Sequence, residues 1–313
     1  MLNNFRKTFV LVAVVATLST GCRSSKEYTK LTETGNKYTD AVDTLLEEAK
    51  ELHIEASSET MLADDRIFNQ TVEQYQENAA KDREIIQVIN EIKNHNRLLK
   101  DYFDKLKELA TNNAPQRAKD EITEIATNLK TVSENLKTTS FFPEESALQG
   151  IGNLVINSQI KGALREELEK RDELILTELT IQQEMLKKLS EFMKVRNEIK
   201  RNAQELHFVI RPLIKEGYMQ YQEERNWIQR RIKILKSDNR VEKLELASNA
   251  LKEFKGVFKD TVAGKITVAR LNNTLEDIDN FLAILNETEQ TENPPANPEN
   301  PANQANQANT QNK

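Results

Sequence analysis

Glycine, proline, aromatic residues and cysteine are all scarce in the body of this sequence, and each shortage narrows the choice of fold. Glycine accounts for 8 of the 313 residues and aromatic residues for 6%, whereas 30% of the residues are charged. Strand-rich folds need glycine, proline and Asn-Gly pairs at their turns, and four of the seven prolines lie beyond residue 292. A highly charged chain that lacks turn residues is typical of long helices and coiled coils, so an all-α fold is predicted.

The motifs of common active sites are also missing. Neither the phosphate-binding G-x-x-x-x-G-K-[ST] nor G-x-S-x-G nor H-E-x-x-H occurs. The three histidines, His53, His95 and His207, lie far apart, and no glutamate stands three residues before any of them, as a di-iron bundle requires. We therefore predict a protein that is not an enzyme and holds no metal and no cofactor, with the histidines on its surface or in a helix seam.

A single cysteine, Cys22, excludes an internal disulfide and a cysteine-based metal site. Arg6 and Lys7 precede an uncharged, largely apolar run over residues 8–18. This run is too short to cross a bilayer, because a spanning helix needs about 20 apolar residues. A basic start, a short apolar run and then small residues are typical of a secretory signal peptide.

The segment Leu18-Ser19-Thr20-Gly21-Cys22 resembles the lipobox of bacterial lipoproteins. Ser19 stands where leucine is commonest and Leu18 lies one residue further back, which the looser form of the pattern accepts. The resemblance covers residues 1–22 alone. It implies that residues 1–21 are a signal peptide cut between Gly21 and Cys22, and that Cys22 carries a lipid on its sulfur and a fatty acid such as palmitate on its amine. The alternative is an ordinary secretory signal with an unrelated cysteine nearby.

Stable anchoring takes two or more acyl chains, so the resemblance implies a membrane-anchored protein of the cell envelope that faces away from the cytoplasm. In a Gram-negative cell this means the outer membrane or the periplasmic face. Loss of residues 1–21 changes the net charge from −6 to −8, because it removes two basic residues and no acidic one. An acidic exported chain binds phosphate backbones poorly, so no nucleic-acid partner is expected.

Apolar residues recur at heptad-like spacing over residues 31–285 and predict an elongated bundle of five to seven helices, partly coiled-coil. The first seam consists of Leu31, Tyr38, Val42, Leu45, Ala49, Leu52 and Ala56. Later seams include Phe68, Val72, Tyr75, Ala79, Ile85, Ile89, Ile92, Leu99, Phe103, Leu106 and Ala110, then Ala118, Ile122, Ile125, Leu129, Val132 and Leu136, and further along Ile214, Tyr218, Tyr221, Ile228, Ile232 and Leu235.

Polar and proline-containing stretches set the predicted boundaries. Residues 22–30 are expected to form the lipidated cysteine and a tether, and a break is expected at residues 57–59. Further breaks are predicted at Pro115 and over residues 138–143, and a kink at Pro212. Residues 286–313 are rich in Pro, Asn and Gln and lack large apolar side chains, so they are predicted to be a disordered tail.

Two stretches depart from the helical pattern. Residues 148–164 hold three of the eight glycines and a single charge, and they predict either a buried crossover or a membrane-contacting segment. Residues 194–243 hold 13 basic and 7 acidic residues, whereas residues 26–91 hold 7 basic and 16 acidic ones. The basic stretch either faces the acidic first helices inside the bundle or meets anionic lipid headgroups or an acidic partner.

These patterns predict a lipid-anchored envelope protein that displays a long helical bundle as an interaction or scaffold surface. Its expected partners are the membrane, through Cys22, and an envelope protein of unknown identity, with self-association into a homo-oligomer as a further option. The alternative is a helical pore-forming or membrane-remodelling protein in which residues 148–164 touch the membrane. A third reading, an enzyme or ligand carrier built from scattered residues, requires a deep polar pocket.

Overall fold

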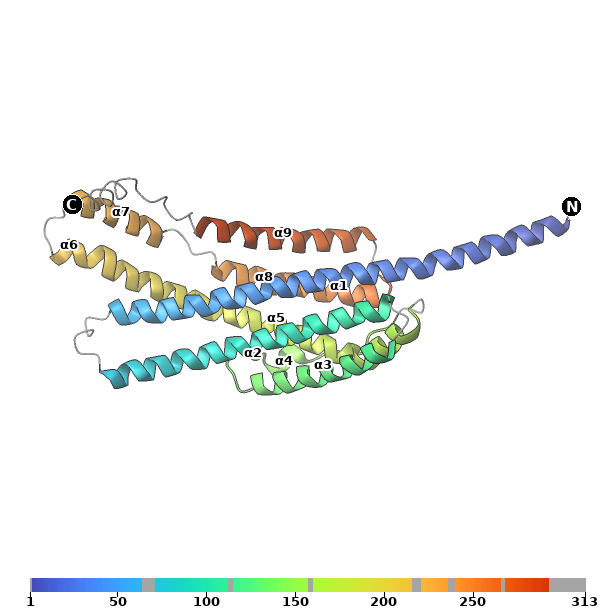
Figure 1. The fold of residues 1–313 in the computed structure, drawn as a ribbon, viewed down its shortest axis with the longest axis horizontal. Helices are drawn as coiled ribbons and strands as arrows, with labels where there is room; N and C mark the ends of the chain where they lie inside the picture. Colours follow the sequence, from blue (N-terminus) through green and yellow to red (C-terminus); the bar gives the residue numbers. More distant parts are fainter. Residues whose placement is uncertain are drawn as a thin grey trace, which may run out of the picture.

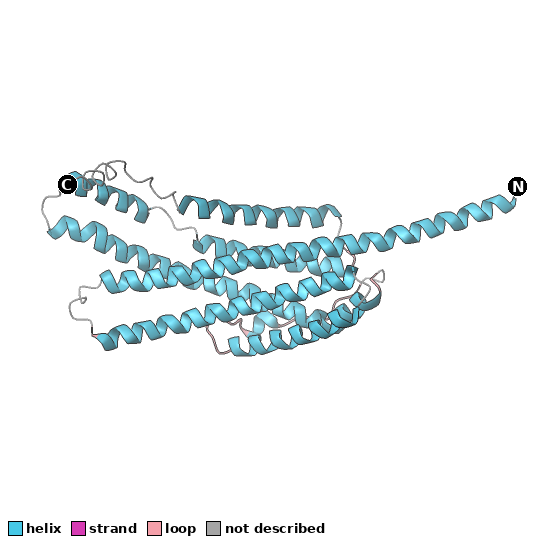
Figure 2. Cartoon of the chain, viewed as in Figure 1, coloured by secondary structure: helices cyan, strands magenta, loops and turns pink. Residues whose placement is uncertain are grey.

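The computed structural model describes residues 2–63, 71–111, 115–156, 160–215, 221–235, 240–265 and 268–292, with the side chains of the first helix described from Tyr28 onward. Every regular element in these ranges is helical and none is a strand (Figure 2), which confirms the all-α prediction. The elements are α1 (Leu2–Ala63), α2 (Val72–Thr111), α3 (Pro115–Leu136), α4 (Glu145–Leu148), α5 (Gly162–Gln204), a π-helical turn η2 (Glu205–Ile210), α6 (Arg211–Lys215), α7 (Tyr221–Leu235), α8 (Arg240–Val262) and α9 (Val268–Glu292).

Four long helices, α1, α2, α5 and α8, run side by side along the long axis of an elongated molecule (Figure 1). α3 packs on α2 and α5, and α9 packs along α1 and α8. The N-terminal part of α1 projects beyond the other helices at one end of the bundle (Figure 1). The opposite end, where α1 ends and α2 begins and where α6 and α7 lie, is called the distal end below.

The predicted seams account for most of the core. All seven residues of the first seam are at most 1% exposed, and all six of the α3 seam are at most 9% exposed. Apolar positions of two seams are exposed at the distal end. Val72 and Tyr75, in the first part of the α2 seam, are 66% and 58% exposed, whereas Ile89, Ile92 and Leu99 further along it are at most 1% exposed. The apolar stripe of α7 is exposed as well. The heptad pattern therefore gives the correct helices but not, at this end, the correct buried faces.

An aromatic cluster fixes the spacing of α1, α2 and α8. The ring of Phe103 lies edge-on against Phe254 and Phe258, with centroid separations of 5.3 and 6.0 Å. Gly35 of α1 faces this cluster, and a Cβ atom there would lie 3.1 Å from Phe254 Cζ and 3.2 Å from Phe103 Cδ2. The hydroxyl of Tyr38 donates to the carbonyl of Ala247 at 2.8 Å and links α1 to α8.

Three predicted boundaries differ from the structure. α1 continues through residues 57–59 to Ala63, because Ser57 is satisfied by donating to Asp82 of α2 at 2.8 Å and so does not end the helix. The backbone of residues 22–30, expected to be a tether, belongs to α1, and Tyr28 is already 2% exposed. α9 continues to Glu292, past the predicted limit at residue 285, and the remaining tail, residues 293–313, lies outside the described residues.

The interruption expected at Pro212 begins one turn earlier, as the π-helical turn η2. A proline has no N–H, so Pro212 cannot donate to the carbonyl of Phe208, its partner in a regular α-helix. The backbone N–H of Arg211 bonds instead to the carbonyl of Leu206, five residues back. The wider turn redirects the chain at the distal end, between α5 and α6 (Figure 1).

Residues 151–156 form an irregular crossover between α4 and α5. Leu148, Ile151, Leu154 and Ile156 pack against the core, and Ile160 is buried. The backbone N–H of Leu154 donates to a carboxylate oxygen of Asp172 on α5. These contacts agree with the crossover interpretation of residues 148–164, although residues 157–159 lie outside the described ranges.

Candidate functional site

The predicted anchor lies in the projecting part of α1 (Figure 1). Gly21 and Cys22 belong to this helix, but their side chains are outside those that the structure describes, so the lipobox resemblance stays a prediction. Tyr28, the first residue of α1 whose side chain the structure describes, is buried and follows Cys22 by six positions. No helix in the described part of the chain combines the length and apolar character that crossing a bilayer requires.

A fully buried polar network joins α2, α3 and α5. His95 of α2 places Nε2 at 2.8 Å from Glu178 Oε2 and Nδ1 at 2.7 Å from Gln182 Oε1, both on α5. The hydroxyl of Ser133 on α3 donates to the same Glu178 oxygen. His95 is 0% exposed, and Glu178 is 3% exposed. Each ring nitrogen of His95 therefore lies within hydrogen-bond distance of a buried oxygen on α5.

Sequence reasoning missed this network, although a signal was present. Gln182 occupies the seam position between Leu179 and Leu186, and Asn96 occupies the one between Ile92 and Leu99. A polar residue at a seam position must find a buried partner. Asn96 does so by donating to the carbonyl of Thr39 at 2.7 Å and to Asp43 at 2.9 Å.

A second buried polar cluster lies further along α5. Arg171 is ion-paired to Glu167 and donates to the hydroxyl of Thr123 on α3 at 2.7 Å. Burial raises the pKa of Glu167 above its ordinary value, against the opposing effect of the Arg171 charge. Burial also raises the pKa of Tyr102, whose hydroxyl faces Glu167. Both clusters lie within the helix contacts and line no open cavity, so we interpret them as packing specificity rather than chemistry.

The other two histidines lie apart from both clusters. His53 is 1% exposed and its Nε2 lies 3.1 Å from Asp82 Oδ1. Burial, reinforced by the Arg196 charge, lowers the pKa of His53, and Asp82 opposes this shift. His207 is half-buried on η2, with its ring against Phe208. Among the described residues, no group of three or more His, Cys, Asp or Glu side chains is arranged to hold a metal ion.

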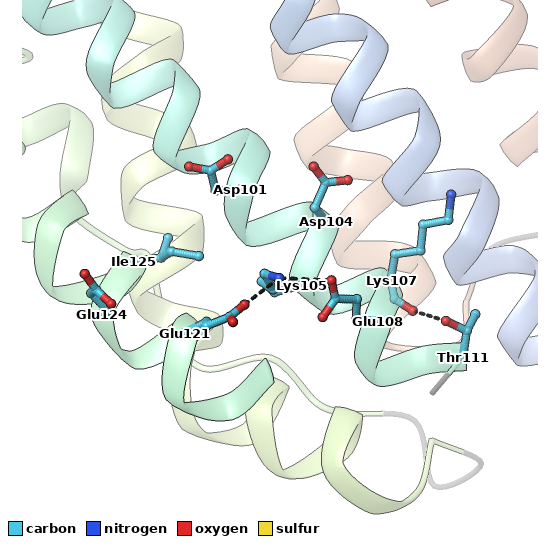
Figure 3. Close-up of a pocket in the computed structure, with 9 residues that line it drawn as sticks. All are labelled: Asp101, Asp104, Lys105, Lys107, Glu108, Thr111, Glu121, Glu124 and Ile125. Carbon is cyan, nitrogen blue, oxygen red and sulfur yellow. Dashed lines mark hydrogen bonds and ion pairs between the residues drawn. The ribbon is translucent and has the colours of Figure 1, made fainter. Parts of the chain in front are cut away.

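A surface groove of about 600 Å³ lies between the end of α2 and the start of α3 (Figure 3). Lys105 lies in it between Glu108, at 2.9 Å, and Glu121, at 2.5 Å. These hydrogen bonds lower the pKa of Glu121 and raise that of Lys105. The groove is lined by Asp101, Asp104, Lys105, Lys107, Glu108, Thr111, Glu121, Glu124 and Ile125. Lys105 is already paired with two carboxylates, and the groove is open rather than deep, so it does not support the ligand-carrier interpretation.

Part of the basic stretch 194–243 faces α1, as the charge-matching interpretation predicts. Lys200 lies 2.7 Å from Glu55, and Lys243 lies 3.3 Å from Glu48. Gln204 donates to Glu59 at 2.9 Å, and Arg211 donates to the carbonyl of Ala63. These contacts hold α5, α6 and α8 against the acidic helix. The basic residues of α7 are not used in this way.

Comparison with known proteins gives no relative. No family model, no curated protein and no solved structure matches this chain. Function must therefore be argued from the residues and the fold.

Proposed function

We propose that this chain is a lipid-anchored, non-catalytic protein of the cell envelope that displays a long helical bundle as an interaction or scaffold surface. The observation that carries the proposal is the lipobox-like segment ending at Cys22, which lies in the N-terminal part of the long helix α1. The buried polar clusters and the ion-paired groove support a structural rather than a chemical role.

The fold gives this proposal a geometry. Cys22 precedes Tyr28 by six positions, or about 9 Å of helix. From Tyr28 to Ala63, α1 runs the length of the bundle, about 53 Å at 1.5 Å per residue. A lipid on Cys22 holds the N-terminal end of the rod near the membrane and presents the distal end about 60 Å away, a reach suited to a partner elsewhere in the envelope.

The pore-forming alternative relies on residues 148–164 as the membrane-contacting segment. In the described part of that segment the aliphatic side chains mostly pack on the core, with Val155, at 77% exposure, as the main exception. Inserting the segment would uncover the core of α5. The packing therefore favours the scaffold proposal.

Fatty-acid labelling tests the anchor. Cells expressing the wild-type chain are labelled with a clickable palmitate analogue beside Cys22→Ser, the double variant Cys22→Ser/Ser24→Cys and the control Ser24→Ala. We expect label and membrane association for the wild type and the control only, because the double variant keeps a thiol but moves it out of the lipobox. Equal labelling of wild type and Cys22→Ser would refute the anchor.

Crosslinking in the native envelope tests the display function. A photo-crosslinker placed at the exposed Tyr75 near the distal end is compared with one at the exposed Lys130 on α3. We expect the distal position to capture one dominant envelope component in wild-type cells and to lose it in the Cys22→Ser strain. Capture that is identical at both positions and in both strains would contradict a display role.

A further inference from the structure

α7 carries an apolar stripe that faces solvent at the distal end. Tyr221, Ile228, Ile232 and Leu235 follow one another at spacings of seven, four and three residues, which places them on one side of a helix. Their exposed fractions are 73%, 46%, 43% and 56%. We call these four residues the α7 stripe.

The opposite side of α7 is the one that packs, and this fixes the outward direction of the stripe. Ile234 is buried, and the indole Nε1 of Trp227 donates to the carbonyl of Val209 on η2 at 3.0 Å. The guanidinium of Arg230 lies 4.9 Å from the ring centre of Phe208. The side chains that hold α7 to the bundle are thus distinct from the α7 stripe.

Basic side chains border the α7 stripe. By helical geometry Arg225 lies on one margin and Arg231 on the other, next to Glu224. Both arginines are exposed, and neither forms an ion pair within the part of the chain that the structure describes. Across α7 there are four basic and two acidic residues. Leu213 and Ile214 of α6, which precede α7 in the chain, are also exposed, at 55% and 75%.

The size of the α7 stripe helps to decide whether it binds a protein partner, a second copy of the chain or a lipid surface. A stable protein partner or a second copy buries at least about 1,000 Å² in total, or about 500 Å² on each side. One face of a helix of 15 residues, about 22 Å long and 10 Å wide, offers roughly 220 Å². A lipid surface needs no matching shape. An apolar face, an interfacial tyrosine and arginines at the margins favour binding to such a surface. They are the pattern of a helix that lies in the plane of an anionic membrane.

We propose that the outer face of α7 docks on an anionic lipid surface. The α7 stripe enters the boundary between headgroups and acyl chains, while Arg225 and Arg231 pair with lipid phosphates. This inference goes beyond the proposed anchor and does not depend on it, because α7 lies at the end of the bundle opposite Cys22. The proposal places a membrane contact at residues 221–235 and not at residues 148–164.

Vesicle sedimentation of the unlipidated protein tests the proposal. The chain from residue 22 onward is prepared with Cys22→Ser, which retains the described core from Tyr28 onward. It is mixed with vesicles of phosphatidylcholine alone or with about one third phosphatidylglycerol. We expect binding to the anionic vesicles only, weakening as salt shortens the Debye length from about 10 Å at 0.1 M to about 3 Å at 1 M.

Two variant pairs separate the apolar and the basic contributions. Ile228→Ser/Ile232→Ser should reduce partitioning at least tenfold, and Arg225→Gln/Arg231→Gln should reduce it about 30-fold, the factor expected for two basic residues near an anionic surface. The matched apolar control is Val195→Ser/Leu246→Ser, at positions that are 56% and 45% exposed on α5 and α8. The matched basic control is Lys130→Gln/Lys137→Gln, at an exposed position on α3 and at one directly after it. The controls should change partitioning less than threefold, with the circular dichroism of every variant unchanged.

Three outcomes of the vesicle experiment overturn the proposal. These are equal binding to neutral and anionic vesicles, losses as large in the controls as in the α7 variants, and no binding by the parent protein. A dimer in sedimentation equilibrium that Ile228→Ser/Ile232→Ser abolishes would identify a second copy as the occupant and also overturn it. A negative vesicle experiment would leave the result of the Cys22 labelling experiment unaffected. A negative labelling experiment would likewise leave vesicle binding by the unlipidated protein unaffected.

Discussion

At the scale of single residues, polar side chains from different helices meet inside the core. His95 and Glu178 are 83 residues apart in sequence and 2.8 Å apart in the bundle. A buried pair of this kind adds little net stability relative to a well-packed apolar pair, but removing one partner is costly. Such a network fixes which faces of α2, α3 and α5 meet, because other registers leave Glu178 buried and unpaired.

The first prediction concerns this network. His95→Ala should lower the free energy of unfolding by about 1–3 kcal/mol, because Glu178 and Gln182 stay buried and each loses a hydrogen-bond partner. The control His207→Ala removes a half-buried ring and should cost about 0.5 kcal/mol. Urea unfolding followed by far-UV circular dichroism measures both. Equal losses for the two variants would show that the His95 network is not a special feature of the core.

The second prediction concerns pH. Burial and the Arg196 charge lower the folded-state pKa of His53, so between that lowered pKa and the ordinary value near 6.5 the unfolded chain binds more protons than the folded one. The free energy of unfolding should therefore fall as pH drops from 7.5 through this window. His53→Phe should lose less stability on acidification than the wild type. Parallel pH profiles from urea unfolding would contradict this assignment.

At the scale of elements, the close approach of α1 to α2 and α8 depends on the missing side chain of Gly35. A methyl group there would press on Phe254 and Phe103 at 3.1 and 3.2 Å. Gly256 of α8 is also inside a helix, but a Cβ atom there would meet nothing within 4 Å. Gly35 is thus required by the packing of the aromatic rings, whereas the packing around Gly256 does not require a glycine.

The third prediction compares the same substitution at these two glycines. Gly256→Ala should raise the free energy of unfolding by about 0.5–1 kcal/mol, because alanine favours helix over glycine. Gly35→Ala gains the same preference but crowds two rings, an effect that typically costs about 1–3 kcal/mol. We therefore expect Gly35→Ala to be the less stable variant in thermal and urea unfolding. An equal gain in the free energy of unfolding at both positions would mean that the aromatic rings can move aside without loss of stability.

At the scale of the whole molecule, the bundle separates its two proposed contacts. The anchor precedes Tyr28 at one end, and α7 lies at the other (Figure 1). The rod between them is held by apolar seams and by ion pairs such as Lys200 with Glu55. α9 closes one side by burying Leu271 and Ile278, each 1% exposed.

The fourth prediction concerns the C-terminal region. Deleting residues 293–313 should change the free energy of unfolding by no more than about 0.5 kcal/mol, because this segment has no large apolar side chain to dock. Deleting residues 268–313 also removes α9 and should cost roughly 4 kcal/mol or more, since each lost buried aliphatic is worth about 2–5 kcal/mol. Slow amide exchange after Asn293 in the intact protein would show that the tail is docked.

The sequence by itself determined what depends on neighbours along the chain. Heptad spacing identified the buried face of α1 from Leu31 to Ala56, proline placed the break before α3, and the lack of turn residues excluded a sheet. The polar positions Asn96 and Gln182 in two seams were also visible, and they could have indicated a buried network without naming its members.

Only the tertiary structure decided what depends on distant segments. Lys200 meets Glu55 across 145 residues, and His95 meets Glu178 across 83; periodicity gives no information on such pairs. α1 continues through Ser57, whose hydroxyl is satisfied by donating to Asp82 of α2. The α7 stripe has the same apolar period as the buried seams, yet it faces solvent because α7 packs through Trp227 and Ile234. A period fixes which side of a helix is apolar, and only the neighbouring helices decide whether that side is covered.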